Sequence, residues 1–329
     1  MKHVTFRQFV LSISSCAGIF LVSMPPARAA VSGLDQVQKA AAAGDAQSQF
    51  QLAQDYDKGL GVKRDPAKAV EWYLKAAQQG NSHAQNNLGG HYSRGEGVTR
   101  DDAEAVKWYR MAAAQGDPLG EKNLGVMLAG GLGSPKDTKG AIEWFKKAAA
   151  AGQAGAMADL GMIYSQGGQD APLDYPAALK WLQRADALGS AAADDRLGEL
   201  YFHGHGVPVD NAQAAKWWGK AAELGEEHAQ LELGFLYLGR KGVKTDLARA
   251  YMWLTLSARQ QDIVASHELY LMRGGFTDDD VTKGQQLIDD YDARHSGSQG
   301  SSQAASQASL QASLLATPAS TGTERSQTQ

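Results

Sequence analysis

The sequence predicts an all-α protein built as a solenoid of antiparallel helix pairs, and three periodic features support this fold class. Six of the seven tryptophans recur every 36 or 37 residues, at Trp72, Trp108, Trp144, Trp181, Trp217 and Trp253. A leucine stands 20 or 21 residues before each of them, at Leu52, Leu88, Leu124, Leu160, Leu197 and Leu233. An aspartate stands seven residues before each of them, at Asp65, Asp101, Asp137, Asp174, Asp210 and Asp246. So many coincident positions define a repeated structural unit.

The first half of each unit has the spacing of an amphipathic helix. In the second unit Ala84, Leu88 and Tyr92 recur every four residues, which places them on one stripe of a helix. Gly95 and Gly97 follow and supply the backbone geometry at which helices commonly end. The pattern therefore predicts a first helix that ends near residue 95.

The second half of each unit predicts another helix. Asp101 stands where its carboxylate would cap the helix start, and the helix then carries Trp108, Tyr109 and Ala112 before Gly116 ends it. We expect the periodic tryptophans to lie in the core, while Trp218, beside a periodic tryptophan, is expected to be partly exposed. A hairpin of this size cannot bury its apolar stripes alone, so copies must stack.

The residues of the unit also resemble a known family. The pattern L-G-x-x-Y-x-x-G-x-G-V at residues 88–98, then Asp101, then W-Y-x-x-A-A-x-x-G at residues 108–116, resembles the Sel1-like repeat. The resemblance covers six units over residues 48–265. It implies a right-handed superhelical solenoid similar to tetratricopeptide repeats. It also implies a role as an adaptor that binds other proteins.

The amino terminus has the features of a secretory leader over residues 1–29. Lys2 and Arg7 form a basic start, residues 9–22 are mostly apolar, and Ala27-Arg28-Ala29 is a small-x-small cleavage site. We therefore expect a periplasmic or secreted protein. A lipid anchor at Cys16 is the alternative, but the apolar stretch continues beyond Cys16 and a better cleavage site follows.

Three further segments flank the repeats. Residues 30–47 predict an N-terminal capping helix, and residues 266–294 predict C-terminal capping helices, the last of which starts with Thr277 and Asp280 in a capping-box pattern. Residues 295–329 are rich in Ser, Gln and Ala, a composition typical of disorder. No apolar run reaches the length of a membrane span, so we expect no transmembrane helix.

Charge and motifs exclude several function classes. The net charge of -4 becomes more negative once the leader is removed, and no basic cluster predicts nucleic-acid binding. Nucleophile elbows and phosphate-binding loops are missing from the sequence, and His267-Glu268 lacks the second histidine of a zinc-protease motif. We therefore predict a protein that is not an enzyme and needs no cofactor. His203 and His205 flank a glycine, but two imidazoles without further ligands favour solvated loop residues over a metal site.

Helical geometry nominates a binding surface. Positions three and six residues after the first core position of each unit point away from the core stripe, and they vary between units. The candidate partner-binding residues are Asn87, Asn123, Val126, Asp159, Met162, Arg196, Glu199, Glu232 and Phe235. Three of them are apolar on a polar face, and they either meet a partner or cover gaps between helices.

The sequence as a whole predicts an exported, non-enzymatic scaffold for protein–protein interactions that acts in the bacterial envelope. Its roles would lie in signalling, secretion, a cell-wall complex or host contact. Two alternatives remain from the sequence. One is a protein that binds or modifies the cell wall, with peptidoglycan as its partner. The other is a lipid-anchored structural component of a secretion complex.

Overall fold

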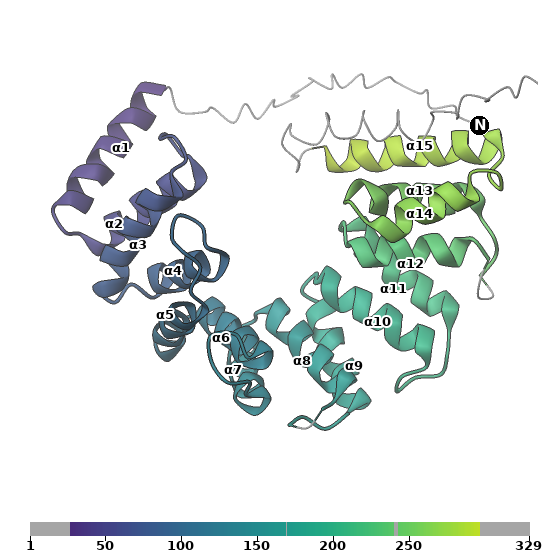
Figure 1. Cartoon of the computed structure of the whole chain (residues 1–329), viewed down its shortest axis with the longest axis horizontal. Coiled ribbons are helices and arrows are strands. Elements are labelled where there is room, and N and C mark those ends of the chain that lie inside the picture. The colour runs from purple at the N-terminus through teal and green to yellow at the C-terminus, as the bar shows by residue number, and fades with distance from the viewer. Residues whose placement is uncertain (1–26, 169, 240–242, 297–329) are drawn as a thin grey trace, which may run out of the picture.

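The chain forms an arch of stacked helices. The computed structural model describes residues 27–168, 170–239 and 243–296, and within these ranges it contains fifteen α-helices and no strand. The helices follow one another along the arch, with α1 (Ala27–Ala42) at one end and α15 (Asp278–His295) at the other (Figure 1). Cys16, nearly all of the predicted leader and the tail after residue 296 lie outside the described residues.

Twelve of these helices pair into six antiparallel hairpins. The first helices of the hairpins are α2 (Ala46–Lys58), α4 (Ser82–Arg94), α6 (Pro118–Gly130), α8 (Ala154–Gln166), α10 (Ala191–His203) and α12 (Glu227–Tyr237). The second helices are α3 (Pro66–Gln78), α5 (Asp102–Ala114), α7 (Thr138–Ala150), α9 (Tyr175–Asp186), α11 (Asn211–Glu223) and α13 (Leu247–Arg259). The two helices of each hairpin pack against each other, and the second helix of each hairpin packs against the first helix of the next hairpin along the chain. The predicted fold class is therefore confirmed.

The periodic aspartates start the second helices, as the sequence predicts. Each of the six is the N-cap residue, and its carboxylate accepts a hydrogen bond from a backbone N–H two or three residues later. Asp101, for example, accepts bonds of 3.0 Å from the backbone nitrogens of both Ala103 and Glu104. These bonds satisfy amide groups that have no partner inside the helix.

The core of five of the six hairpins contains a close contact between a glycine and one large side chain. A methyl group added at Gly125 on α6 would lie only 2.7 Å from Cε1 of Phe145 on α7, so the glycine is required for this approach. Five hairpins share the arrangement: Gly89 faces Tyr109, Gly125 faces Phe145, Gly161 faces Leu182, Gly198 faces Trp218, and Gly234 faces Leu254. All five large side chains are buried. In every case the buried residue directly follows the periodic tryptophan.

The periodic tryptophans themselves are less buried than the sequence suggests. Trp108 and Trp253 are buried, whereas the other four are half-buried, each with a basic side chain from the next turn over its indole ring. Those stacked pairs are Lys75 on Trp72 at 3.7 Å, Lys147 on Trp144 at 3.9 Å, Arg184 on Trp181 at 4.5 Å and Lys220 on Trp217 at 4.1 Å, measured to the ring.

The expectation that Trp218 is partly exposed is wrong. Its side chain is 1% exposed, and its indole nitrogen donates a hydrogen bond of 3.1 Å to the backbone oxygen of Asp195. The reason is that Trp218 occupies the inward position that faces Gly198, whereas Trp217 is rotated by about 100° around the helix.

Two helices close the carboxyl end of the arch. Both α14 (Ile263–Met272) and α15 pack on α13. Arg259 of α13 forms an ion pair of 2.8 Å with Asp292 of α15, and Thr277 and Asp280 form the predicted capping box.

At the amino end α1 packs on α2 and begins at Ala27, so the expected cleavage point after Ala29 falls in its first turn. None of the helices in the described ranges is both long and apolar enough to cross a membrane.

We predict that Phe145→Ala costs more stability than Trp144→Ala. Phe145 is 1% exposed and fills the space beside Gly125, so its truncation should lower the free energy of unfolding by ~3–5 kcal/mol. Trp144 is half-buried and loses less contact area. Urea denaturation followed by circular dichroism measures both variants. A Trp144→Ala variant at least as unstable as Phe145→Ala would show that the core is assigned to the wrong residue.

Candidate functional site

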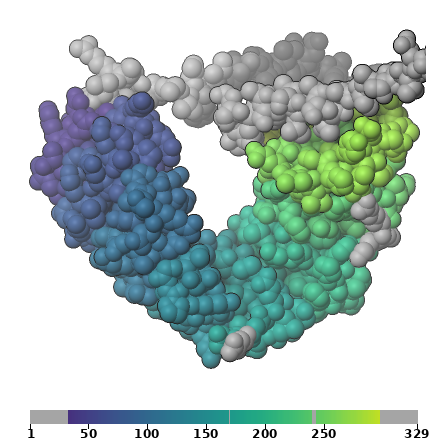
Figure 2. All heavy atoms as spheres, in the orientation of Figure 1, coloured from purple at the N-terminus to yellow at the C-terminus, as the bar shows by residue number. Residues whose placement is uncertain are grey.

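The first helices of the hairpins form the inner side of the arch. Contacts between first helices of adjacent hairpins, such as α4 with α6 and α8 with α10, are more extensive than those between second helices. The side on which neighbouring helices come closest is the inside of a curve. We call the surface made by α2, α4, α6, α8, α10 and α12 the inner face. Figure 2 shows the hollow between the two arms of the arch.

The nine candidate residues all lie on these first helices. Val126 is 38% exposed, and the other eight are half-buried. The structure joins some of them: Asn87 and Asn123 belong to one hydrogen-bonded chain, and Glu199 and Glu232 approach the same histidine. The apolar residues Met162 and Phe235 lie on α8 and α12, and the same position on α10 between them is Glu199. The apolar candidates therefore do not form one continuous patch.

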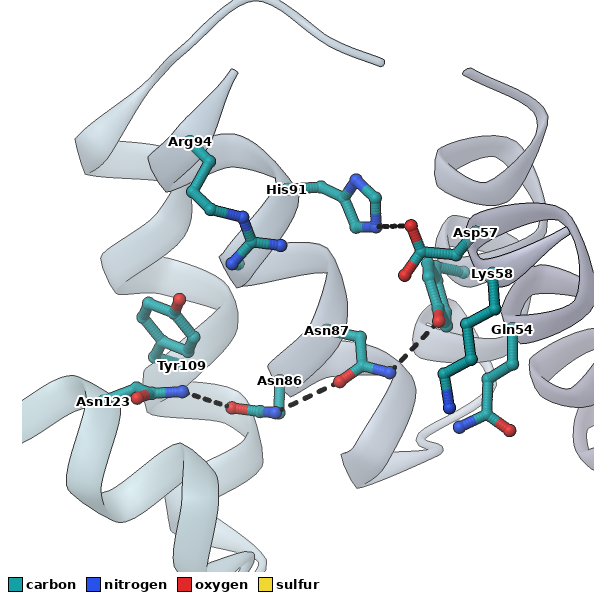
Figure 3. Close-up of a pocket in the computed structure, with 11 residues that line it drawn as sticks. Gln54, Asp57, Lys58, Asn86, Asn87, His91, Arg94, Tyr109 and Asn123 are labelled. Atoms are coloured by element: carbon teal, nitrogen blue, oxygen red, sulfur yellow. Dashed lines mark hydrogen bonds and ion pairs between the residues drawn. The ribbon is translucent and has the colours of Figure 1, made fainter. Parts of the chain in front are cut away.

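A pocket of about 320 Å³ opens at the amino-terminal half of the inner face. We call it the amide pocket. It spans the first three hairpins, and many of its side chains carry amide groups (Figure 3). Its lining residues are Gln54, Asp57, Lys58, Tyr73, Asn86, Asn87, Gly90, His91, Arg94, Tyr109 and Asn123.

Three asparagines and a tyrosine form a hydrogen-bonded chain along the wall of the amide pocket. Asn123 donates to Asn86 at 2.9 Å, Asn86 donates to Asn87 at 3.2 Å, and Asn87 donates to the Tyr73 hydroxyl at 3.2 Å (Figure 3). Asn86 is 8% exposed, so this chain is largely shielded from water. Burial also raises the pKa of Tyr73 to about 12, which keeps its hydroxyl neutral. The chain links side chains from three hairpins and fixes the orientation of the amide groups of the second and third.

Charged groups surround these amides. His91 is 1% exposed, and its Nε2 lies 3.6 Å from the Asp57 carboxylate of the preceding hairpin. The side chains of Lys58 and Arg94 are exposed at the rim of the amide pocket, and Arg94 pairs with Glu96 at 3.0 Å. The pocket therefore offers amide donors and acceptors inside and cationic groups at its edge.

The carboxyl-terminal half of the inner face is acidic. Asp159 on α8 is half-buried, and this burial raises the pKa of its carboxyl group. Further along, Asp195, Glu199, His228 and Glu232 approach one another across the junction of α10 and α12, and we call them the histidine–carboxylate cluster. Arg196 lies beside this cluster and donates to Glu199 at 2.7 Å.

The hydrogen bond from His228 determines the protonation of the cluster. His228 Nδ1 lies 2.8 Å from the Asp195 carboxylate, and this bond raises the pKa of His228 to about 9 although partial burial opposes the shift. The two loop histidines considered from the sequence make aromatic contacts. His203 and His205 stack with ring centres 5.4 Å apart, and His205 also stacks on Tyr175.

Sequence reasoning missed several residues of the inner face. Asn86, His91, Asp195 and His228 occupy positions that a single-helix pattern assigns neither to the core nor to the exposed face. Each contacts a neighbouring hairpin, with a partner 33 to 37 residues away in all four cases. A useful signal was available, because Asp195 with Glu199 and His228 with Glu232 are spaced four residues apart and so share helix faces.

Comparisons with known proteins agree with the repeat. The Sel1 repeat family model matches the chain six times, at residues 46–81, 82–117, 118–153, 154–190, 191–226 and 227–262. The chain is also similar to a crystal structure of a Sel1 repeat protein from Oxalobacter formigenes, with 34% identity and a TM-score of 0.61. That similarity covers 69% of this chain and 99% of the other.

Two further solved structures are more distant. A protective antigen present in uropathogenic Escherichia coli strains is 27% identical over 83% of this chain and 76% of its own, with a TM-score of 0.35. A putative Sel1 repeat protein from Klebsiella pneumoniae is 24% identical over 62% of this chain and 98% of its own, with a TM-score of 0.43. No curated protein matched the sequence.

We predict that Asn86→Ala lowers the free energy of unfolding by about 1–3 kcal/mol. The substitution removes the acceptor for Asn123 and the donor for Asn87, and it leaves polar groups without partners in a shielded position. Lys58→Ala at the exposed rim of the same pocket is the matched control and should change stability by less than about 0.5 kcal/mol. Equal stability of the two variants in chemical denaturation would contradict a structural role for the asparagine chain.

Proposed function

The chain belongs to the Sel1 repeat family, and from that premise we propose that it is a non-enzymatic adaptor that binds segments of other proteins along its inner face. Solenoids of this kind expose a long curved surface made by one helix of each repeat. The six hairpins of this chain provide such a surface. A scaffold for protein interactions is the role that this fold generally serves.

The contrast between a repeated core and an unrepeated inner face carries the proposal. The glycine and the large side chain of the core recur from hairpin to hairpin, because packing requires them. The inner-face position of Asn123 is not constrained in this way, and it is filled in turn by Gln51, Asn87, Asn123, Asp159, Arg196 and Glu232. A surface that varies while its support is constant is suited to recognising one particular partner.

The charges of the inner face indicate the chemistry of that partner. Lys58 and Arg94 stand at the rim of the amide pocket, whereas carboxylates predominate around the histidine–carboxylate cluster. Complementary charge favours an extended segment with acidic side chains at the amino-terminal half of the arch and basic side chains at the other. The amide groups of the pocket would form hydrogen bonds with the backbone N–H and C=O groups of that segment.

We also propose that the chain is exported and acts in the envelope, with its leader cleaved after Ala29. The basic start, the apolar stretch and the Ala27-Arg28-Ala29 site support this proposal. Export would deliver the arch to partners outside the cytoplasm. The absence of cysteine after residue 16 fits a fold that depends on packing in an oxidising compartment.

We predict that substitutions in the amide pocket abolish partner capture. Cells that express a tagged chain with a photocrosslinker on the inner face should yield a specific protein adduct. A variant carrying Gln54→Ala, Lys58→Ala and Arg94→Ala should lower the yield by about tenfold, since central contacts dominate binding energy. The matched control carries Glu104→Ala, Lys107→Ala and Lys146→Ala, which are exposed on second helices. Equal loss in both variants, or retention on peptidoglycan in place of a protein adduct, would contradict the proposal.

We predict that the mature chain begins at Ala30. N-terminal sequencing of the protein from the periplasmic or culture fraction should identify this residue, and Ala29→Phe should leave the precursor unprocessed because the cleavage site requires a small side chain. Cys16→Ser is the matched control and should be processed normally. If processing depends on Cys16 and lipid is attached to this residue, the prediction is wrong and the chain is anchored to a membrane.

A further inference from the structure

Two pairs of metal-ligating side chains face each other across the fifth and sixth hairpins. Asp195 and Glu199 lie one turn apart on α10, and His228 and Glu232 lie one turn apart on α12. The ligand atoms of Asp195, Glu199 and His228 are all within 4.8 Å of one another. Side chains of three residues from two helices therefore converge on one point of the inner face, and Glu232 approaches His228 from the same helix, at 3.8 Å.

The buried Asp195 carboxylate orients the imidazole. The side chain of Asp195 is 7% exposed, and its oxygen lies 2.8 Å from Nδ1 of His228. The backbone oxygen of Asp195 accepts the indole hydrogen bond of Trp218, which fixes this turn of α10. With Nδ1 engaged, Nε2 of His228 points to the other two carboxylates, at 4.0 Å from Glu199 and 3.8 Å from Glu232.

We propose that the histidine–carboxylate cluster binds a divalent transition-metal ion, with Zn²⁺ as the best fit. The ligands are Nε2 of His228 and one carboxylate oxygen each from Glu199 and Glu232, and water completes the coordination. One imidazole with two carboxylates is a donor set that zinc accepts. Asp195 acts on the far ring nitrogen, in the carboxylate–histidine–metal arrangement that fixes the tautomer of a metal-bound histidine. This site is separate from the amide pocket, but it lies in the acidic half of the inner face that the proposed function assigns to basic side chains of the partner.

Two of the three ligand separations require only a small contraction. Bonds of about 2.0–2.1 Å to a tetrahedral zinc ion place neighbouring ligand atoms ~3.4 Å apart. The separations of 3.8 and 4.0 Å between Nε2 of His228 and the two carboxylates are close to that value. The side chains of both glutamates are partly exposed, and they must rotate toward each other to complete the ligand set. Arg196 pairs with Oε2 of Glu199, whereas the oxygen that faces His228 is Oε1. The pair therefore holds Glu199 in place without occupying its ligand atom.

A proton competes with the metal for this position. Without an ion, His228 is held as an imidazolium between the carboxylates, and zinc must displace the proton from Nε2 to the solvent. An ion-paired histidine with no metal affinity is therefore the alternative that an experiment must exclude.

The repeat supplies an internal control for the site. The positions of Asp195, Glu199, His228 and Glu232 correspond, in the first and second hairpins, to Phe50, Gln54, His83 and Asn87. His83 thus occupies the same position as His228, but its ring lies 6.0 Å from that of Phe50, and the glutamates are replaced by amides. Nδ1 of His83 also has a carboxylate beside it, from Asp117 at 2.6 Å, so this histidine lacks only the two glutamates and should not bind the ion.

The test is a zinc titration of the full chain, purified without a polyhistidine tag. Calorimetry and competition with a chromophoric chelator should show one ion per chain. His228→Ala should abolish that binding, while His83→Ala should leave it unchanged. Asp195→Asn should weaken it by on the order of 10–100-fold, as expected for the loss of an outer-shell carboxylate. Co²⁺ in place of Zn²⁺ should give the visible absorption of a tetrahedral site with wild type and not with His228→Ala.

Two further variants guard against misfolding and against a different site. Glu232→Gln is partly exposed and conservative, so it should fold and still lose most of the affinity. His203→Ala with His205→Ala tests the stacked loop histidines. The proposal is overturned by a chain that takes up no zinc, by binding that survives both His228→Ala and Glu232→Gln, or by binding that disappears when His203 and His205 are replaced.

Discussion

The close contact between a glycine and a large side chain is the constraint on which the rest of the structure depends. Because five of the six hairpins have glycine at this position, the two helices approach until a ring or a leucine lies against the backbone. Gly198 and Trp218 show that this contact accommodates even an indole ring, because Trp218 lies against Gly198 and is fully buried. In the first hairpin Ala53 takes the glycine position and both it and Tyr73 remain fully buried. The contact fixes the geometry of each hairpin, and stacking then carries that geometry along the arch.

Much of the fold could be predicted because it depends on local signals that recur. The aspartate caps, the glycines after the first helices and the capping box at Thr277 are short-range patterns, and the structure confirms them. The inward side of the second helix was assigned less well. Tryptophan and its neighbour are both periodic, and periodicity alone does not distinguish two adjacent positions that differ by about 100° around a helix. The deciding fact is which of them faces the glycine, and that contact spans about 20 residues.

For a related reason, the sequence indicated candidate residues of the inner face but did not identify the residues that contact a neighbouring hairpin. Helical spacing within one unit indicates which positions leave the core, and it placed Asn87, Asn123 and Glu199 correctly on the first helices. It gives no information about the seam, by which we mean the contact between the first helices of adjacent hairpins. Asn86 and Asp195 are buried in that seam, where they bond to residues one repeat away. The interactions that organise the site therefore belong to pairs of hairpins, and only the stacked structure brings them together.

The seam also explains how one fold can carry chemically different sites. Stacking brings the same positions of adjacent hairpins to successive junctions of the arch, so the identity of the side chains there influences what a junction can bind. At the first junction Phe50 and His83 make an aromatic contact beside the amide pocket. At the fifth junction the equivalent Asp195 and His228 make a charge-assisted hydrogen bond. The glycine contacts are present beside both sets, because they lie between the two helices of one hairpin. Substitutions on the inner face can thus change what the arch binds while the packing that holds the arch together stays the same.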